Sequence, residues 1–328
     1  MAVQDFDSVR DVDYREAANF LNANDGFCVV SHAHPDGDTL GSAAALVLAL
    51  RKLGKSAFAL CADEIPGKLA FFNEGGVFES VESISKAQTF VSVDVASKPM
   101  LGALDFLVEG RKFALSVDHH EVNSIPCEKR LLRANYIANG EIVYELLKEL
   151  GVPLDKEIAT ALYGAICSDS GGFKYPATRP ETYEYAAELI RAGADFDFIN
   201  KQLFECKSME QVALEKSAYE ALEFHYGGRF AMVAVSAETM KACGAKESDI
   251  DVLNQIPRQV EGVEVSAVLR PKGEEIKVSL RSNADINVAE FAKAHGGGGH
   301  YHAAGYRLCC SLDEAKARII EDVKSVFS

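Results

Sequence analysis

Short apolar runs that end in a carboxylate or an imidazole recur through the first half of this chain. The run at 27–31 leads into the segment His-Ala-His-Pro-Asp-Gly-Asp at 32–38, and later runs end at Asp94, Asp118 and Asp169. Strands that alternate with helices form parallel sheets. Because the carboxyl ends of parallel strands meet at one edge of a sheet, we expect these side chains to gather there.

The pattern of apolar residues changes along the chain and predicts two domains, since 328 residues exceed one comfortable core. Up to residue 190, alternating runs predict an α/β fold with a mostly parallel, doubly wound sheet. Residues 191–226 show no strand pattern and are expected to form a helical linker. Residues 227–328 predict a smaller α+β domain with a mixed sheet. Strands are expected at 27–31, 57–61, 89–95, 112–118, 230–235, 263–270 and 276–281, and helices at 39–54, 140–150, 155–168, 196–204, 209–224 and 312–327.

The charge of the chain limits its partners. It contains 34 Lys and Arg against 49 Asp and Glu, a formal net charge of −15. Proteins hold long duplexes mainly by neutralising phosphates, so we expect no long duplex nucleic acid as a partner. Residues 226–328 carry 13 basic and 14 acidic side chains, so almost all of the negative net charge lies in the first 225 residues. A small or single-stranded anionic substrate is compatible with this charge.

The cysteines and the hydropathy predict a cytoplasmic protein that does not enter a membrane. Eight scattered cysteines form no Cys-x-x-Cys pair, and no signal peptide is recognisable, so reduced thiols are expected. The longest apolar candidate, 43–50, is much shorter than the roughly 18 residues that suggest a membrane span.

The first polar segment is a candidate metal site. His32, Asp36 and Asp38 surround a Pro-Asp-Gly turn, which lets one imidazole and two carboxylates face a common point. Carboxylate oxygens suit Mg²⁺ or Mn²⁺, and an added imidazole favours Mn²⁺, with Fe²⁺ or Co²⁺ as rivals. The alternative is ordinary turn chemistry, with Asp38 as the N-cap of the following helix.

Three further segments strengthen the metal interpretation. The adjacent histidines in Asp118-His119-His120 end an apolar strand, where they have no packing purpose. Asp94 ends another strand, and its alternative role is a helix cap. Asp169 closes a predicted helix, where the helix dipole disfavours an acid unless a cation compensates it.

A glycine run in the second domain is a candidate anion site. Gly296-Gly297-Gly298-Gly299 precedes His300, and an apolar segment follows at 303–308. A flexible loop is the plain interpretation, but glycines also let backbone N–H groups approach an anion. Arg281 ends a predicted strand and could bind a phosphate in bidentate fashion, or simply be an exposed strand-end residue.

Five segments taken in order resemble the motifs of DHH/DHHA1-family phosphoesterases, a superfamily that includes the RecJ exonuclease, family II inorganic pyrophosphatases and the nanoRNases. The resemblance implies a DHH catalytic, metal-binding domain at 1–190 and a DHHA1 substrate-binding domain at 227–328. The matching segments are 32–42, Val93-Asp94, Asp118-His119-His120, 168–173, and 297–300 with 303–305.

The resemblance also implies a role for each site residue. Two Mn²⁺ ions are expected, with Mg²⁺ or Co²⁺ as alternatives, and Asp94 would bridge them. His120 would face the scissile phosphate, and Asp118 would hold the histidines from behind. The expected ligands are His32, Asp36 and Asp94 for one ion, and Asp38, Asp94, His119 and Asp169 for the other. The expected substrate-binding residues are Arg281, Ser282, Gly297, Gly298, Gly299 and His300.

Domain content selects among the activities of the family. The chain is similar to the stand-alone members that hydrolyse short oligoribonucleotides (nanoRNA) to mononucleotides and 3′-phosphoadenosine 5′-phosphate (pAp) to AMP by a two-metal-activated hydroxide. A linear dinucleotide such as pApA, in cyclic-di-AMP turnover, is an alternative substrate. A non-catalytic nucleotide-binding regulator is an alternative of a different class. The assembly state stays open between a monomer and a homodimer.

Overall fold

The computed structural model describes residues 9–246 and 249–327, apart from the side chains of residues 251 and 300. The chain forms two compact units, Met1–Cys206 and Lys207–Ser328. The segment 191–226, expected to be a helical linker, contributes helices to both units. Among the described residues, no helix is long and apolar enough to span a bilayer.

A six-stranded sheet forms the centre of the first unit, in the order β1-β6-β5-β4-β2-β3. Every neighbouring pair is parallel, with Val29 opposite Val91 and Val91 opposite Leu115. The mostly parallel α/β sheet predicted from the sequence is confirmed. Its strands are β1 (Arg10–Asp11), β2 (Phe27–Val30), β3 (Ala57–Leu60), β4 (Thr89–Val93), β5 (Phe113–Asp118) and β6 (Cys127–Leu132).

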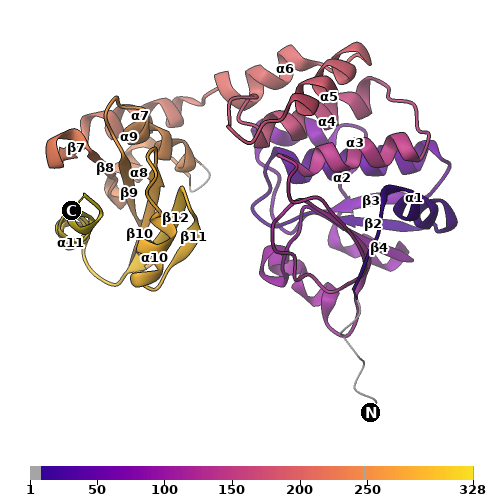
Figure 1. The fold of residues 1–328 in the computed structure, drawn as a ribbon, viewed down its shortest axis with the longest axis horizontal. Coiled ribbons are helices and arrows are strands. Elements are labelled where there is room, and N and C mark those ends of the chain that lie inside the picture. Colours follow the sequence, from indigo (N-terminus) through magenta and orange to yellow (C-terminus); the bar gives the residue numbers. More distant parts are fainter. Residues whose placement is uncertain (1–8, 247–248, 328) are drawn as a thin grey trace. The chain divides into compact units, whose positions relative to one another are not determined.

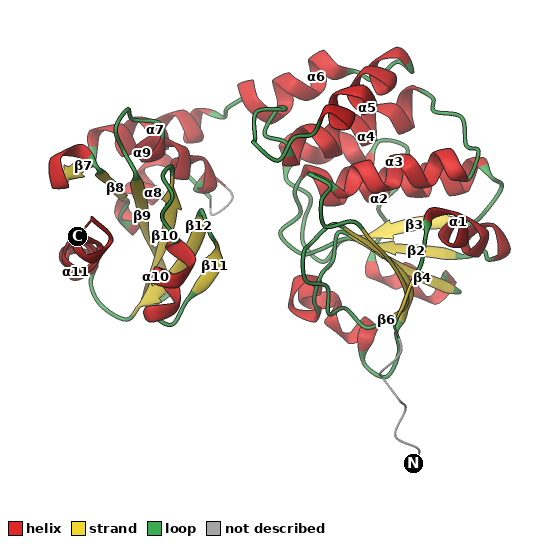
Figure 2. Cartoon of the chain, in the orientation of Figure 1, coloured by secondary structure: helices red, strands yellow, loops and turns green. Residues whose placement is uncertain are grey.

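Helices cover this sheet because their apolar faces need the strands to pack against. Figure 2 shows α2, α3 and α4 on one side of the sheet, where their buried Ala, Leu and Ile side chains join the main core. A second core lies around β2, β3 and β5 and the 3₁₀ segment η3 (Lys98–Val108). The helices are α1 (Tyr14–Ala23), α2 (Gly37–Lys52), α3 (Asn139–Glu149), α4 (Lys156–Asp169), α5 (Pro180–Arg191) and α6 (Phe196–Asn200), and further 3₁₀ segments are η1 (Gly67–Asn73) and η2 (Val81–Lys86).

The second unit contains a mixed sheet in the order β11-β12-β10-β9-β8-β7 (Figure 1). Only the β8–β9 pair is parallel among its described pairings, so the smaller α+β mixed-sheet domain is confirmed. Its strands are β7 (Leu222–His225), β8 (Phe230–Ala234), β9 (Val265–Lys272), β10 (Glu275–Ser282), β11 (Gly298–His300) and β12 (Ala303–Leu308), and its helices are α7 (Met209–Glu220), α8 (Ala237–Cys243), α9 (Gln255–Arg258), α10 (Val288–Ala294) and α11 (Leu312–Val323), with η5 (Tyr226–Gly228), η7 (Asp251–Asn254) and η8 (Lys324–Phe327).

One predicted segment differs in the structure, and one of the alternatives left open is excluded. The helix expected at 209–224 ends at Glu220, and Leu222–His225 forms strand β7, because pairing with β8 outweighs the local helical pattern. The glycine run is no flexible loop, because Gly298–His300 forms strand β11 against β12. Tertiary pairing therefore decides both segments.

Candidate metal centre

The predicted ligands lie at the carboxyl edge of the parallel sheet. His32 follows β2, Asp94 follows β4, and His119 follows β5, and these three strands are neighbours. The other three carboxylates lie at helix ends, since Asp36 is the N-cap of α2, Asp38 lies in its first turn and Asp169 is the last residue of α4. The edge therefore collects side chains that are up to 137 positions apart in the sequence.

His32, Asp36 and Asp94 form the first group, with one donor atom from each within 4.8 Å of the others. The Nε2 atom of His32 lies 3.3 Å from Asp94 Oδ2 and 3.7 Å from Asp36 Oδ1. Its Nδ1 atom is 2.7 Å from the carbonyl oxygen of Ala33. That contact fixes the ring so that Nε2 faces the carboxylates, as in histidines that bind metals.

Asp38, His119 and Asp169 form the second group, again within 4.8 Å. His119 Nε2 is 3.8 Å from an oxygen of Asp38 and of Asp169, and 3.3 Å from Asp94 Oδ1. The carbonyl oxygen of Tyr136 lies 3.2 Å from His119 Nδ1 and orients this ring. Asp94 faces both groups, since its two oxygens approach His32 and His119 respectively.

Asp94 is held in an unusual conformation. Its φ of 57° places a non-glycine residue in the left-handed region, which is uncommon and costs energy. It is 2 % exposed, and its Oδ1 atom has no hydrogen bond of acceptable geometry, although His119 Nε2 is near. A buried carboxylate oxygen without a hydrogen bond is costly unless a ligand completes it.

Asp38 is fully buried and also binds a distant helix. Its carboxylate accepts hydrogen bonds from the backbone N–H groups of Asn139 (2.6 Å) and Gly140 (2.8 Å) at the start of α3. The N-cap of α2 is Asp36, which accepts from the N–H groups of Asp38 and Thr39 at 3.0 Å each. The N-cap role that was considered for Asp38 therefore belongs to Asp36.

His120 points into a separate hydrogen-bonded chain. Its Nδ1 atom lies 2.8 Å from Asp118 Oδ1, and Asp118 Oδ2 accepts a 2.6 Å hydrogen bond from Asn123 Nδ2. Asp94, His119 and His120 could form a third metal-binding group. However, Asp118 already engages His120 Nδ1. Sequence reasoning missed Asn123, because a buried amide five residues after Asp118 leaves no pattern.

Charge crowding shifts the pKa values of this centre. Burial and the charge of Asp94 raise the pKa of Asp38, and burial and Asp38 raise that of Asp169. Burial would raise the pKa of Asp94, but the nearby imidazoles of His119 and His32 outweigh it and lower the value. Burial opposes charge on both imidazoles, yet Asp94 raises the pKa of His32 to about 9 and that of His119 to about 11.

These shifts and the donor set fit divalent cations. Four carboxylates and two imidazoles meet in a small, mostly buried volume, and protons on the imidazoles balance part of the negative charge. A bound metal ion would replace those protons, since imidazole ligates in its neutral form. His34 lies outside this arrangement, because its side chain is 92 % exposed and contacts Asp63.

The substrate-binding candidates lie in the second unit. Arg281 on β10 pairs with Ala303 on β12, which pairs with His300 on β11, so these residues share one cross-strand row. The side chain of His300 lies outside the described residues. Ser282 is buried, and its hydroxyl contacts the carbonyl oxygen of Ile286 and His302 Nδ1, both at 2.8 Å.

The glycines at 297–299, in and just before β11, have a packing reason of their own. A Cβ on Gly297 would lie 2.1 Å from the carbonyl oxygen of Gly305, and one on Gly299 would lie 2.5 Å from that of Ala303. Gly298 faces open space. Close strand packing therefore requires two of the three glycines, and contact with an anion stays a prediction.

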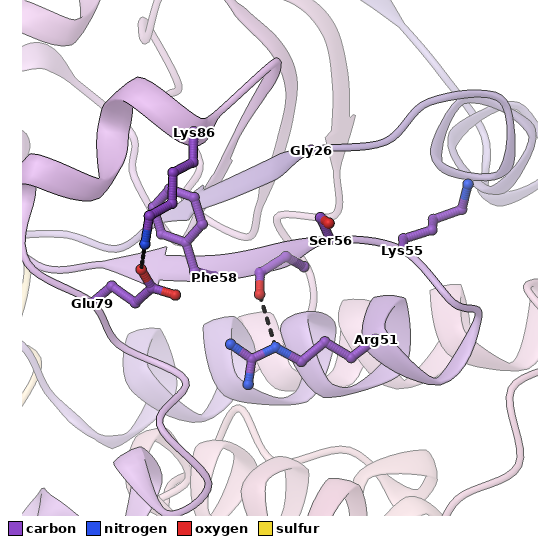
Figure 3. A pocket seen from close by; sticks show the side chains of 8 residues that line it. Gly26, Arg51, Lys55, Ser56, Phe58, Glu79 and Lys86 are labelled. Carbon is purple, nitrogen blue, oxygen red and sulfur yellow. Dashed lines mark hydrogen bonds and ion pairs between the residues drawn. The ribbon is translucent and has the colours of Figure 1, made fainter.

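A pocket of about 390 Å³ lies at the opposite edge of the parallel sheet. Its lining includes Gly26 and Ser56, which directly precede β2 and β3. Figure 3 shows Lys86 bonded to Glu79 (2.9 Å) and Arg51 bonded to the carbonyl oxygen of Ala57 (2.8 Å). Its Arg and Lys side chains have hydrogen-bond partners in the protein, and its lining includes none of the predicted ligands.

Comparisons with known proteins agree with this architecture. A protein-family model described as the DHH family, N-terminal domain, matches residues 26–166. A second family model, described as the DHHA1 domain, matches residues 218–328. A Thermus thermophilus protein named bifunctional oligoribonuclease and PAP phosphatase NrnA is 33% identical over 313 residues, covering 94% of this chain and 93% of its own. The chain belongs to the DHH/DHHA1 family. The resemblance inferred from its motifs is confirmed.

Solved structures show the same fold for this DHH/DHHA1 chain. An exopolyphosphatase-related protein from Bacteroides fragilis superposes with a TM-score of 0.87 at 22% identity, over 95% of this chain and 96% of the other. The exonuclease RecJ bound to manganese superposes with a TM-score of 0.57 at 16% identity, over 97% and 95% of the two chains. At these identities the match supports the fold alone.

Proposed function

We propose that this chain is a metal-dependent phosphoesterase that hydrolyses short oligoribonucleotides to mononucleotides and pAp to AMP. The observation that carries the proposal is the convergence of six side chains into two donor groups, with Asp94 of the first group facing His119 of the second. The name of the Thermus thermophilus relative supports these two substrates. The chain is a hydrolase of phosphoester bonds in this proposal, with two Mn²⁺ ions as its cofactors and Mg²⁺ or Co²⁺ as alternatives.

The residues present divide the work between two sets. His32, Asp36 and Asp94 would hold one ion, and Asp38, Asp94, His119 and Asp169 would hold the other. When bound, such ions supply Lewis-acid chemistry, which neutralises phosphate charge and lowers the pKa of water. The carbonyl oxygens of Ala33 and Tyr136 keep the two histidine rings aimed at the centre, so little reorganisation is needed.

His120 would donate a proton at the phosphate. Asp118 fixes its Nδ1 atom, which leaves Nε2 as the nitrogen that can donate to a phosphate or leaving oxygen. The pKa of His120 is raised by its hydrogen bond to Asp118, against burial, which favours the donor form. Arg281, Ser282, Gly297, Gly298, Gly299 and His300 would receive the substrate on the second unit.

Hydrolysis of defined substrates tests this proposal. The purified chain is incubated with pAp, with pApA and with a 5′-labelled RNA ladder of two to twenty nucleotides, in Mn²⁺, Mg²⁺ or Co²⁺ and with EDTA as the control. We expect metal-dependent release of phosphate from pAp and fastest loss of the shortest oligomers. A preference for pApA over both would favour the dinucleotide alternative, and no hydrolysis with any metal would favour a nucleotide-binding regulator.

Asp169→Asn provides the matched inactive variant. Among described residues, Asp169 has no side-chain hydrogen bond to the protein, and 27 % of its side chain is exposed, so the fold should tolerate the amide. Loss of hydrolysis with an unchanged melting temperature would support a ligand role. Full activity in Asp169→Asn would contradict its assignment to the centre.

A further inference from the structure

An exposed aromatic surface follows the metal centre in the chain. It consists of Tyr175, Phe204 and Lys174, which we name the aromatic platform. Tyr175 is 43 % exposed and Phe204 is 41 % exposed, and Lys174 Nζ lies 5.7 Å from the centroid of the Phe204 ring. Among the described residues, neither ring packs against another aromatic ring.

The loop that carries Tyr175 is tightly folded directly after Asp169. Gly171, Gly172 and Phe173 have φ values of 59°, 70° and 64°, which places three consecutive residues in the left-handed region. The carbonyl oxygen of Ser170 accepts from the N–H groups of Lys174 (2.9 Å) and Tyr175 (3.1 Å). The chain therefore reverses at once. The two glycines adopt this conformation readily, whereas Phe173 is strained in it, and such strained residues are concentrated at functional sites.

Phe173 anchors the reversed loop in the core. Its ring lies 5.7 Å from those of Tyr163 and Tyr183, and the Tyr183 hydroxyl donates to the Phe173 carbonyl oxygen at 2.8 Å. The loop is therefore tied to the main core at Phe173, while Tyr175, two residues later, is exposed.

Two glycines set the positions of the platform rings. A Cβ on Gly171 would lie 2.5 Å from Tyr175 Cζ, so the ring rests directly on this backbone, two residues after Asp169. A Cβ on Gly172 would lie 3.4 Å from Phe204 Cε2. Phe204 itself lies on a π-helical turn, Lys201–Glu205, an element that often marks functional sites. Both rings therefore lie against the backbone that leaves the metal centre.

We propose that the aromatic platform stacks a nucleobase of the substrate beside the metal centre. Stacking on aromatic rings accepts every base, and Lys174 adds a positive charge suited to the phosphate backbone of a single strand. The inference rests on the proposed function, because it takes the base to belong to the phosphoester substrate. It gives an acidic chain a means of holding an anionic substrate that does not depend on net charge.

Fluorescence measures base stacking without turnover. The chain contains no Trp, so Tyr175→Trp and, separately, Phe204→Trp place a single reporter on the platform. We expect AMP, added with Mn²⁺, to quench this fluorescence in a saturable way, and ribose 5-phosphate, which lacks the base, to leave it unchanged. Phe106→Trp is the matched control, because Phe106 is 42 % exposed but lies on η3, which packs against the other core of the sheet.

Kinetics measure the same contact during hydrolysis. Tyr175→Ala should raise KM for pAp about tenfold and leave kcat within about twofold, since stacking is equal in the ground and transition states. Tyr175→Phe should retain the wild-type KM. Hydrolysis of ribose 3′,5′-bisphosphate, which lacks adenine, should be the same in Tyr175→Ala and wild type.

The outcomes separate the platform from the proposed function. Absence of quenching by AMP in both reporters, equal quenching in Phe106→Trp, or an unchanged KM in Tyr175→Ala would overturn the platform, even if hydrolysis is intact. An equal loss on pAp and ribose 3′,5′-bisphosphate would assign Tyr175 a purely structural role. Saturable quenching in a chain that hydrolyses nothing would support the platform and contradict the catalytic proposal.

Discussion

The two edges of the parallel sheet treat charged side chains in opposite ways. At the carboxyl edge, carboxylates and imidazoles face one another with too few partners, and a buried oxygen of Asp94 has no hydrogen bond. At the amino edge, the pocket in Figure 3 also collects charges, but Arg51 donates to the carbonyl oxygens of Ala57, Gly75 and Gly76. Incomplete hydrogen bonding, rather than charge density, therefore distinguishes the edge that suits a ligand.

The amino-edge charges instead hold loops in place. Lys55 donates to the carbonyl oxygens of Asn22 and Asn24 at 2.8 and 2.6 Å, which ties the start of β3 to the end of α1. Lys86 pairs with Glu79. Mutations at the two edges should therefore have contrasting effects on catalysis and stability.

Asp94→Asn should produce the largest loss. The amide keeps the size of the side chain but removes the charge that faces both donor groups, so kcat/KM for pAp should fall by more than about 10³-fold, ~4 kcal/mol of transition-state stabilisation. Steady-state kinetics in Mn²⁺ measure it, with circular dichroism to verify folding. A kcat/KM within tenfold of wild type would contradict the assignment of Asp94 as a ligand of both metal ions.

The second-largest effect should be the stabilisation of the folded chain by metal binding at the carboxyl edge. Cations that relieve the repulsion among buried carboxylates bind the folded chain only, so Mn²⁺ at about 100 times its Kd adds ~2.7 kcal/mol and raises Tm by roughly 5–10 °C. Thermal melts with Mn²⁺ and with EDTA measure this shift. Asp169→Asn is the control, and an equal shift in that variant would place the bound Mn²⁺ elsewhere.

Asn123→Ala should have an intermediate effect. The change leaves Asp118 Oδ2 without its 2.6 Å donor, so His120 is less firmly oriented, and kcat should fall about 10- to 100-fold. The Mn²⁺-induced shift in Tm should remain, because the donor groups are intact. A lost shift with unchanged kcat would show that Asn123 supports metal binding rather than His120.

Lys86→Gln should have the smallest effect. Its ion pair with Glu79 is exposed, with 66 % of the Lys86 side chain accessible, so its loss should cost about 0.5 kcal/mol and leave kcat/KM within about twofold. Urea unfolding and the pAp assay measure these values. A tenfold loss of activity would contradict the claim that charges at the amino edge have no role in catalysis.

Much of the first unit could be predicted because its signals are local. Buried strands such as Phe27–Val30 are short apolar runs, and His32 and Asp94 directly follow strand ends that a parallel sheet brings together. The six expected ligands lie together in the structure, while their individual roles stay predictions. Local pattern also identified the mixed sheet of the second unit.

The remainder depends on contacts that no local pattern records. Asp38 binds backbone groups that are 101 and 102 residues away, and Asp94 adopts a left-handed conformation although it is not a glycine. The adjacent residues His119 and His120 look equivalent in sequence, yet Tyr136 orients one and Asp118 the other. Strands β1 and β6 were not predicted, since charged residues interrupt their apolar pattern.

The two hydrogen bonds that Asp38 accepts at the start of α3 limit which mutations can remove the metal centre without cost to the fold. Because one carboxylate both faces His119 and caps a buried helix, a mutation that removes it weakens folding as well as chemistry. A lineage that no longer needed the reaction would still be selected to retain this acid for its stability. Asp38 alone is therefore a poor indicator of activity among relatives, whereas Asp169, which has no such second role among the described contacts, is an informative one.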